Sequence, residues 1–427
     1  MTTSRIAGWL MLGMIVLSIL HGLVPEVPRL YAGIAAWTAG LLLMGHLQGL
    51  QRTQTVIMFL LGSAGLLYGM TTLPGISFEK AIATNQALLA MLAAVSFLRL
   101  ITLPTADKLE TNPTGSAALW RTLFGVHLFG AVINLSAVMI LGDRLAAKRP
   151  LAPLQATVLS RGFAMASLWS PFFAAMGIAL TNAPGSQLTT LSLTGVPLTL
   201  FALLVSGWIL TRHDQVDEFI GYPMQFDSLW IPALLACAVL AIHQLSPPTP
   251  ILTIISLLAL LLTMTLLIVR HQTVGIQQFI KHIETGLPSM SGELGLFLAA
   301  GVLAAGIATT IQASGIDISL GYFGPWEATL LLIAMVALSV IGVHPVISIA
   351  TAGGIFAPLV DDPNLLGVTF LMTWALGIST SPFSGMHLAM QGRFMIDARN
   401  FTRWNGPFTL FMLLVATGVL HIYAALS

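Results

Sequence analysis

The feature that most limits what this chain can fold into is a series of long apolar segments separated by short polar ones. Each is long enough to cross the hydrocarbon core of a bilayer, which takes roughly 17–25 residues. Only 8% of the 427 residues are charged, too few to cover a surface in water, where roughly 25% is usual. The sequence therefore predicts an all-α polytopic membrane protein. About eleven transmembrane helices are expected, at 6–23, 29–48, 55–72, 81–101, 154–180, 189–211, 229–246, 249–270, 292–312, 363–390 and 405–425.

Composition also excludes several classes of function. The net charge is +1, and no stripe of Lys and Arg indicates a nucleic-acid partner. The single cysteine, Cys237, excludes an internal disulfide and argues against cysteine-based metal sites. The first apolar run follows Arg5 without a small-residue cleavage site, so we interpret it as a retained helix rather than a signal peptide.

Two apolar stretches, 116–148 and 325–360, are too long for one crossing and too short for two. Both carry Gly, His, Asn or Pro in the middle, which favours re-entrant hairpins that enter and leave by the same face. The first ends in a basic segment and the second at Asp361-Asp362, so the two should enter from opposite faces. The segment 273–289 mixes charged and apolar residues and suits a helix at the inner interface, with a polar loop as the alternative.

The positive charges support this topology, since cytoplasmic loops concentrate Lys and Arg. With the N-terminus in the cytoplasm and the C-terminus in the periplasm of a bacterial inner membrane, only Arg29 and Lys80 fall outside. The cytoplasmic side receives Arg5, Arg52, Arg99, Lys108, Arg121, Arg144, Lys148, Arg149, Arg161, Arg212, Arg270, Lys281, Arg393, Arg399 and Arg403.

Three matches in the same order indicate an internal repeat. Residues 125–127 (GVH) recur at 342–344, residues 167–172 (SLWSPF) are answered by 378–383 (ISTSPF), and residues 195–201 (GVPLTLF) by 405–411 (NGPFTLF). The offsets are 217, 211 and 210 residues. An odd number of crossings separates the copies, which predicts an inverted-topology repeat. The expected organisation is an extra N-terminal helix at 1–28, a first repeat at 29–212, a cytoplasmic linker at 213–228 and a second repeat at 229–427.

Ser-Pro pairs lie in the middle of two long segments at matching places in the repeat. Proline removes a backbone donor and clashes with the preceding turn, so each helix should break there and free carbonyl groups. Such breaks in a membrane are tolerated where they are buried or line a wet cavity. Simple kinks with self-bonded hydroxyls are the alternative. The candidate residues at the breaks are Ser167, Ser170, Pro171, Ser379, Thr380, Ser381, Pro382 and Ser384.

The hairpin tips should form the opposite wall of the site, pairing with the two breaks in either a crossed or a same-half arrangement. Their polar residues are His127, Asn134, Ser136, His344, Ser348 and Thr351. A satisfied core histidine is the alternative for His127 and His344, while His387 and Gln391 have no counterpart in the other half. No Asp or Glu falls clearly at mid-depth. Coupling therefore depends on Na⁺ near Ser170 and Ser381, or on protons carried by the histidines. No other cofactor and no nucleotide-binding loop are expected.

With its hairpins, breaks and repeated halves, the chain resembles the ion transporter superfamily, which includes divalent anion/sodium symporters, arsenite exporters and gluconate and citrate permeases. The resemblance implies eleven-helix protomers, homodimers, and a transport domain that moves against a scaffold like an elevator. Sodium/dicarboxylate members carry Ser-Asn-Thr at each tip and Thr-Pro or a close variant at each break. Here the Ser-Pro pairs match, but the tips read Asn134-Leu135-Ser136 and 348–351 (SIAT), so a dicarboxylate substrate is not implied.

These observations favour a secondary active transporter rather than an enzyme. The expected substrate is a small organic anion, coupled to Na⁺ or H⁺. An exporter or flippase of an amphiphilic or lipid-linked anion is the alternative, and an intramembrane enzyme using His127 and His344 is a third hypothesis, weakened by the lack of a further ligand. The partners expected are the small-molecule or lipid-like anion, membrane lipids and a second copy of the chain.

Overall fold

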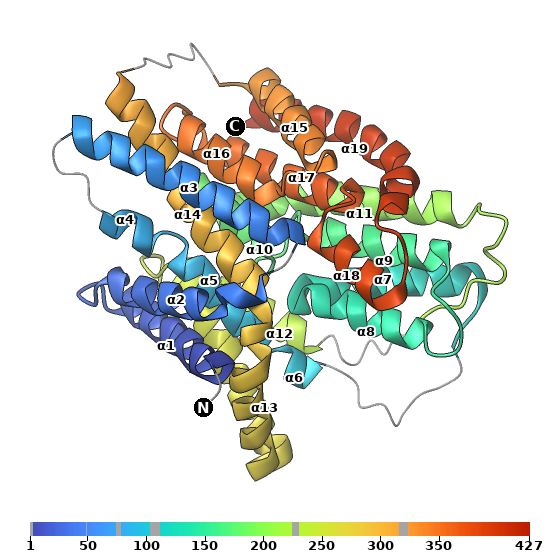
Figure 1. Ribbon diagram of the computed structural model, residues 1–427. Helices are drawn as coiled ribbons and strands as arrows, with labels where there is room; N and C mark the ends of the chain where they lie inside the picture. Colours follow the sequence, from blue (N-terminus) through green and yellow to red (C-terminus); the bar gives the residue numbers. More distant parts are fainter. Residues whose placement is uncertain (1–2, 48, 74–77, 103–111, 224–229, 316–322) are drawn as a thin grey trace. The chain divides into compact units, whose positions relative to one another are not determined.

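The computed structural model describes residues 3–47, 49–73, 78–102, 112–223, 230–315 and 323–427 (Figure 1). Regular structure in these residues is helical, apart from one isolated β-bridge between Thr114 and Ile220. The chain divides into two compact units. Unit 1 comprises Met1–Ile101, Ala233–Gly321 and Ala350–Leu359, and unit 2 comprises Thr102–Pro232, Tyr322–Ile349 and Val360–Ser427. Both halves of the sequence thus contribute to both units.

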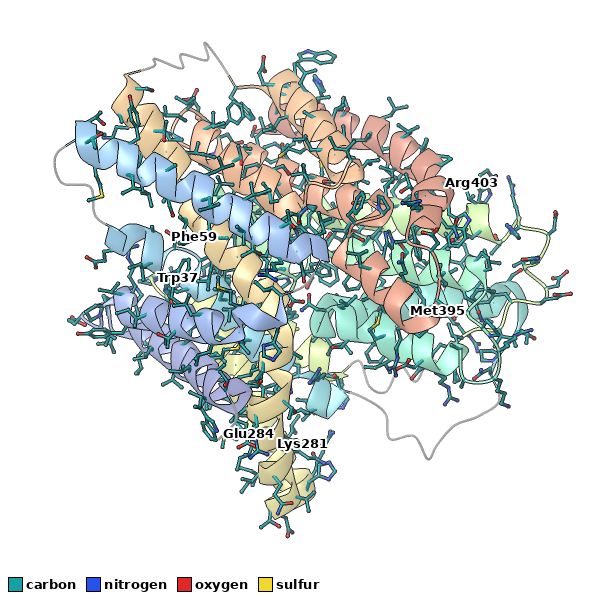
Figure 2. All side chains as sticks on the ribbon, in the orientation of Figure 1. Trp37, Phe59, Lys281, Glu284, Met395 and Arg403 are labelled. Atoms are coloured by element: carbon teal, nitrogen blue, oxygen red, sulfur yellow. The ribbon has the colours of Figure 1, made fainter. Side chains whose placement is uncertain are left out.

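Unit 1 contains two long helices whose backbones approach closely at glycines. A Cβ at Gly62 would lie 2.5 Å from the carbonyl of Val302, and one at Gly306 would lie 2.2 Å from the carbonyl oxygen of Gly62. Small residues that let backbones meet are the usual basis of helix association in lipid. Trp37 and Phe59 pack beside this contact with ring centroids 5.7 Å apart (Figure 2). The helices assigned mainly to this unit are α1 (Thr3–Leu23), α2 (Arg29–Leu43), α3 (Gly49–Thr72), α4 (Phe78–Ala83), α5 (Gln86–Ser96), α12 (Trp230–Leu245), α13 (Ile251–Lys281) and α14 (Ser291–Ser314).

The structure adds detail to two of the expected segments of unit 1. The segment 81–101 is interrupted at Asn85, whose φ is +63° and whose side-chain amide donates to the carbonyl of Phe297 at 2.8 Å. It comprises the end of α4, α5 and the short α6 (Arg99–Thr102), and Ala81–Thr102 as a whole is long and apolar enough to cross a membrane. The segment 273–289 is helical, as one of the two interpretations had it. It begins as the part of α13 that follows a kink at Gln272.

One order of elements occurs twice, mainly within unit 2. The first series is α7 (Gly115–Ile133), α8 (Leu135–Leu145), α9 (Pro153–Ala166), α10 (Ala174–Asn182) and α11 (Leu188–Leu210). The second is α15 (Pro325–Val340), α16 (Pro345–Phe356), α17 (Pro363–Thr380), α18 (Gly385–Phe394) and α19 (Arg399–Leu426). Each stretch predicted as a hairpin is thus two helices joined by a turn. The division between the units falls inside α16.

The segment predicted as a linker is more ordered than expected where the structure describes it. Residues 213–223 run back to the start of α7, where Gly115 N–H donates to Phe219 O at 2.9 Å and Gly221 N–H donates to Pro113 O at 2.8 Å. Residues 224–229 lie outside the described residues.

The described residues contain eight stretches of helix that are long and apolar enough to cross a membrane. This total takes Ile251–Ser314 as one stretch and Pro363–Phe394 as another, and it leaves out shorter apolar helices such as Pro325–Val340. The structure therefore supports a multi-pass helical protein, and the count of eleven stays a prediction.

Candidate functional site

The two helices that lead into the Ser-Pro pairs, α9 and α17, are buried on every side. All residues of α9 from Leu154 to Ala166 are buried, and so are all residues of α17 from Leu365 to Thr380. The two helices pack against each other inside unit 2. A helix interrupted in such a place is shielded from lipid, which is the condition for irregular backbone at membrane depth.

The helical path stops at each Ser-Pro pair. α9 ends at Ala166 and α10 begins at Ala174, so we name residues 167–173 the first break. α17 ends at Thr380 and α18 begins at Gly385, so residues 381–384 are the second break. In both, the serine Oγ accepts the backbone N–H of the residue two positions later at 3.2 Å, Phe172 in the first break and Phe383 in the second.

The carbonyl groups freed at the breaks are bound by hydroxyls of the following long helix at matching positions. Ser192 of α11 donates to Trp169 O at 2.8 Å, and Thr402 of α19 donates to Thr380 O at 2.8 Å. Ser192 and Thr402 are 210 residues apart, and the two acceptors are 211 apart. The two halves thus bond their breaks in the same way.

A pair of threonines on the same two helices, α11 and α19, extends this correspondence. Thr199 of α11 donates to Met165 O at 3.1 Å in the last turn of α9. Thr409 of α19, at the matching position, lies against the last turn of α17, with its Oγ1 3.3 Å from Ser379 Oγ and in hydrogen-bond contact with Thr380 Oγ1. Ser379 and Thr380 are candidates from the sequence. The structure places both beside Thr409, which sequence reasoning missed.

Each hairpin contacts the break of its own half, which answers the question of crossed or same-half pairing. In the first half, Ser170 Oγ donates to Ala131 O and Asn134 Nδ2 donates to Phe172 O at 3.1 Å. In the second half, a Cβ at Gly342 in the turn would lie 3.2 Å from the ring of Phe383. Asn134 has φ of +53° and ψ of −141°, close to the first central position of a type II′ turn, where glycine is usual.

His127 is held between two partners. The indole Nε1–H of Trp169 donates to His127 Nε2 at 3.1 Å, and His127 Nδ1 lies 3.0 Å from Gly162 O. An indole N–H only donates, so Nε2 accepts and the proton sits on Nδ1, which donates to the carbonyl. His127 is therefore a fully bonded neutral ring that ties the first hairpin to the first break.

The remaining sequence candidates make local contacts. His344 Nδ1 accepts the N–H of Val346 at 3.2 Å, and its ring meets the Trp374 ring edge-on at 5.6 Å. Ser348 donates to Pro345 O at 3.1 Å within α16, and Ser167 donates to Ala164 O at 2.6 Å in the last turn of α9. Ser384 accepts the N–H of His387 at 3.2 Å and starts α18. Pro171 is buried, whereas Pro382, Ser136 and Thr351 are half-buried.

A buried polar network at the second break was missed by sequence reasoning. Arg161 Nε donates to Asn405 Oδ1 at 2.8 Å, and Asn405 Nδ2 donates to Ser379 O at 2.6 Å and to Ser160 Oγ at 3.1 Å. Ser160 Oγ lies 2.8 Å from His387 Nε2, and His387 Nδ1 lies 2.7 Å from Ser381 O. The network joins α9 to both sides of the second break.

Two members of this network were not recognised as site residues from the sequence. Arg161 was counted among the charges on the cytoplasmic side, and the structure shows that only 4% of it is exposed. His387, set aside for want of a counterpart, lies at the second break and stacks on Phe401 with centroids 3.9 Å apart. Asn405 stands in the repeat opposite Gly195, and that mismatch was the available signal.

The metal hypothesis for the histidines gains nothing from the geometry. Within the described residues, no three His, Cys, Asp or Glu side chains form a group that could hold a metal ion. His127 and His344 each contact their own half of unit 2.

Comparisons with known proteins find similarity among solved structures only. No family model and no curated protein matches the chain. Among solved structures, the YdaH transporter of Alcanivorax borkumensis, whose crystal structure is described as revealing an unusual topology, aligns over 100% of this chain and 99% of its own. The two are 14% identical with a TM-score of 0.45. At that level the likeness shows neither a shared activity nor a shared substrate.

Proposed function

We propose that the chain is a secondary active transporter that moves a small organic anion across the bacterial inner membrane by alternating access. The observation that carries this proposal is the pair of buried helix breaks in unit 2. In each break a serine hydroxyl accepts the N–H two residues later, and a carbonyl at the matching position accepts a hydroxyl of the following long helix. A duplicated break of this kind, near the middle of a membrane protein, is the usual site architecture of repeat-built transporters.

The physical basis is the set of polar ends that the breaks create inside an apolar core. α10 and α18 start at the breaks, and the exposed N–H groups and dipole of a helix N-terminus favour a negative charge. α9 and α17 end there, and their carbonyl oxygens and nearby hydroxyls favour a cation. We propose that the two halves are inverted copies, that their hairpins enter from opposite faces, and that the transport movement is elevator-like.

The coupling ion in this proposal is Na⁺ or H⁺. The hydroxyls of Ser170 and Ser381 each accept one backbone N–H and keep a second lone pair for a cation. Protons would be carried by histidines. Membership of the ion transporter superfamily and a homodimeric assembly belong to the same proposal, and both follow from the sequence resemblance.

Uptake into proteoliposomes tests the function directly. Purified protein is reconstituted, and accumulation of radiolabelled carboxylates is followed under an imposed Na⁺ gradient, an imposed pH gradient and neither. We expect accumulation of at least one organic anion under one of the two gradients. A broad carboxylate panel with no gradient-driven accumulation would contradict the proposal.

Replacing the prolines tests whether the breaks matter. In Pro171→Ala and Pro382→Ala the helix can reform its lost hydrogen bond, so we expect initial uptake rates to fall by roughly tenfold or more, a cost of about 1.4 kcal/mol in the transport barrier. Yield of folded protein should change less. Pro153→Ala is the matched control, because that exposed proline occupies the first turn of α9, where no donor is missed. Wild-type rates in both break variants would reduce the breaks to kinks.

A further inference from the structure

Arg161 is a strongly basic side chain that is almost fully buried. It is 4% exposed and lies in α9, where every neighbouring residue of the helix is also buried. Taking an ionised group out of water costs several kcal/mol unless another charge compensates it. The guanidinium stays protonated in proteins, so the positive charge at this place needs an explanation.

The neighbours of Arg161 are all neutral. Its Nε donates to Asn405 Oδ1 at 2.8 Å, its Nη2 donates to Trp404 O at 2.9 Å, and its Cζ lies 4.5 Å from the centre of the Phe408 ring. The ion pairs of Arg5 with Glu284 and of Arg393 with Asp143 do not include Arg161.

One nitrogen of this guanidinium is buried without an acceptor. Nη1 carries two N–H groups and makes no hydrogen bond, although it is shielded from solvent. A buried donor left unpaired costs roughly 1–3 kcal/mol, and more when it is charged. The cation thus lacks both a counter-charge and an acceptor at the same atom, and a carboxylate oxygen supplies both.

The charged group is present in only one of the two halves. The position 211 residues after Arg161 is Met372, the one after Ser160 is Leu371, and the one before His387 is Met176. The hydrogen bonds that close the breaks occur in both halves, so the structure of a break does not require Arg161. An anion site, in contrast, is needed only once for each substrate.

From these observations we propose that Arg161 binds the carboxylate of the transported substrate through its free Nη1 edge, and that the site takes one negative charge. The proposal rests on the transporter function above and narrows its substrate to monocarboxylates. Because one cation is available and the neighbouring groups are neutral, a second negative charge on the ligand would be buried unpaired. Asn405 is a positioning residue here, since it holds the guanidinium and also donates to Ser379 O at the second break.

Ligand-induced stabilisation tests the assignment in the purified full-length protein. The probes are acetate, benzoate, succinate and inorganic phosphate, each added as the sodium salt at neutral pH against matched sodium chloride. A ligand that binds the native state raises the melting temperature. We expect a monocarboxylate to stabilise the wild type and to bind Arg161→Met roughly 10- to 100-fold more weakly, as for the loss of a charged hydrogen bond. Arg161→Lys should retain partial binding.

The ligand-induced shift separates a binding role from a structural one. Met is the residue that the other half carries at this position, but it leaves Asn405 Oδ1 and the Trp404 carbonyl without the donors that they have in the wild type. We therefore expect the melting temperature of Arg161→Met without ligand to fall, because an unpaired buried acceptor costs roughly 1–3 kcal/mol, and binding is measured as the shift from each variant's own ligand-free melting temperature. Arg212→Met is the matched control, because Arg212 also packs over an aromatic ring, Trp208, at 3.6 Å but is exposed. It should respond to the probes as the wild type does.

Three results would overturn the assignment. The first is an Arg161→Met variant whose melting temperature rises with the probes as much as that of the wild type. The second is stabilisation of the wild type by phosphate or succinate alone. The third is stabilisation of the wild type by none of the four probes. The uptake assay distinguishes failure of the Arg161 assignment from failure of the proposed transporter function. Unchanged carboxylate uptake by Arg161→Met would refute the role of Arg161 and leave the transporter standing, whereas a wild type that transports no anion would refute the function itself.

Discussion

At the scale of single residues, the contacts assign different roles to groups that look alike in the sequence. His127 and His387 are both buried and both have two bonded ring nitrogens. His127 is bonded within the first half of unit 2, whereas His387 joins α18 to α9 through Ser160. The first ties a hairpin to its own break, and the second connects the two halves.

The pair of His127 and Trp169 gives a prediction at this scale. Trp169→Phe removes the indole donor and leaves His127 Nε2 unpaired in a buried place, so we expect the free energy of unfolding to fall by about 1–3 kcal/mol. Adding His127→Phe to that variant should cost less than His127→Phe does alone, because the hydrogen bond between the two rings is already absent in that variant. Unfolding in a graded denaturing detergent, followed by tryptophan fluorescence or circular dichroism, measures all four proteins. Strictly additive effects would show that the two rings do not interact.

At the scale of elements, the long helix after each break acts as its hydrogen-bonding partner. α11 lies so close to the first break that a Cβ at Gly195 would sit 1.9 Å from Leu168 O. At the matching place on α19, Asn405 reaches Ser379 O with its side chain. Leu168 O and Ser379 O thus occupy matching positions in the two halves. The first contacts the glycine backbone of α11, and the second accepts a hydrogen bond from the side-chain amide of Asn405.

This close approach predicts a severe effect of a single methyl group. In Gly195→Ala the new Cβ meets a backbone carbonyl, so α11 or the first break must move, and we expect a loss of about 1–3 kcal/mol in the free energy of unfolding. Gly418→Ala in α19 is the control, since no atom lies within 4 Å of its Cβ position and alanine favours helix by up to about 1 kcal/mol. Detergent unfolding of both variants checks this, and equal stability of the two would contradict the contact.

The elements show what the sequence could and could not predict. The positions of both hairpins and of both Ser-Pro breaks follow from Pro, Gly and polar residues in apolar stretches, because these residues act on the local backbone. The break at Asn85 escaped notice because Thr84-Asn85 carries no proline, and its φ is stabilised by a contact with Phe297, more than 200 residues away. Arg161 and Asn405 were missed for the same reason. Their pairing spans 244 residues, and no local pattern reports a contact at that distance.

At the scale of the whole molecule, the order of elements in unit 2 makes the opposite entry of the hairpins testable. Cys237 is the chain's single cysteine, so a Cys237→Ser background has no native thiol. Arg149→Cys follows the first hairpin and Asp361→Cys follows the second, and both positions are exposed. We expect a membrane-impermeant maleimide added to intact cells to label Asp361→Cys and to leave Arg149→Cys unlabelled until the cells are opened. Labelling of both from the same side would refute the inverted arrangement.

The mismatch between Gly195 and Asn405 has a consequence for any cycle in which the two halves exchange roles. Identical copies would give the inward-facing and outward-facing states equal free energy by symmetry. In the inverted-repeat transporter that we propose, a glycine contact at one carbonyl and an amide hydrogen bond at the other would make these two states differ in free energy. The empty protein would then favour the state that opens to one side of the membrane, and Gly195 and Asn405 would contribute to that preference.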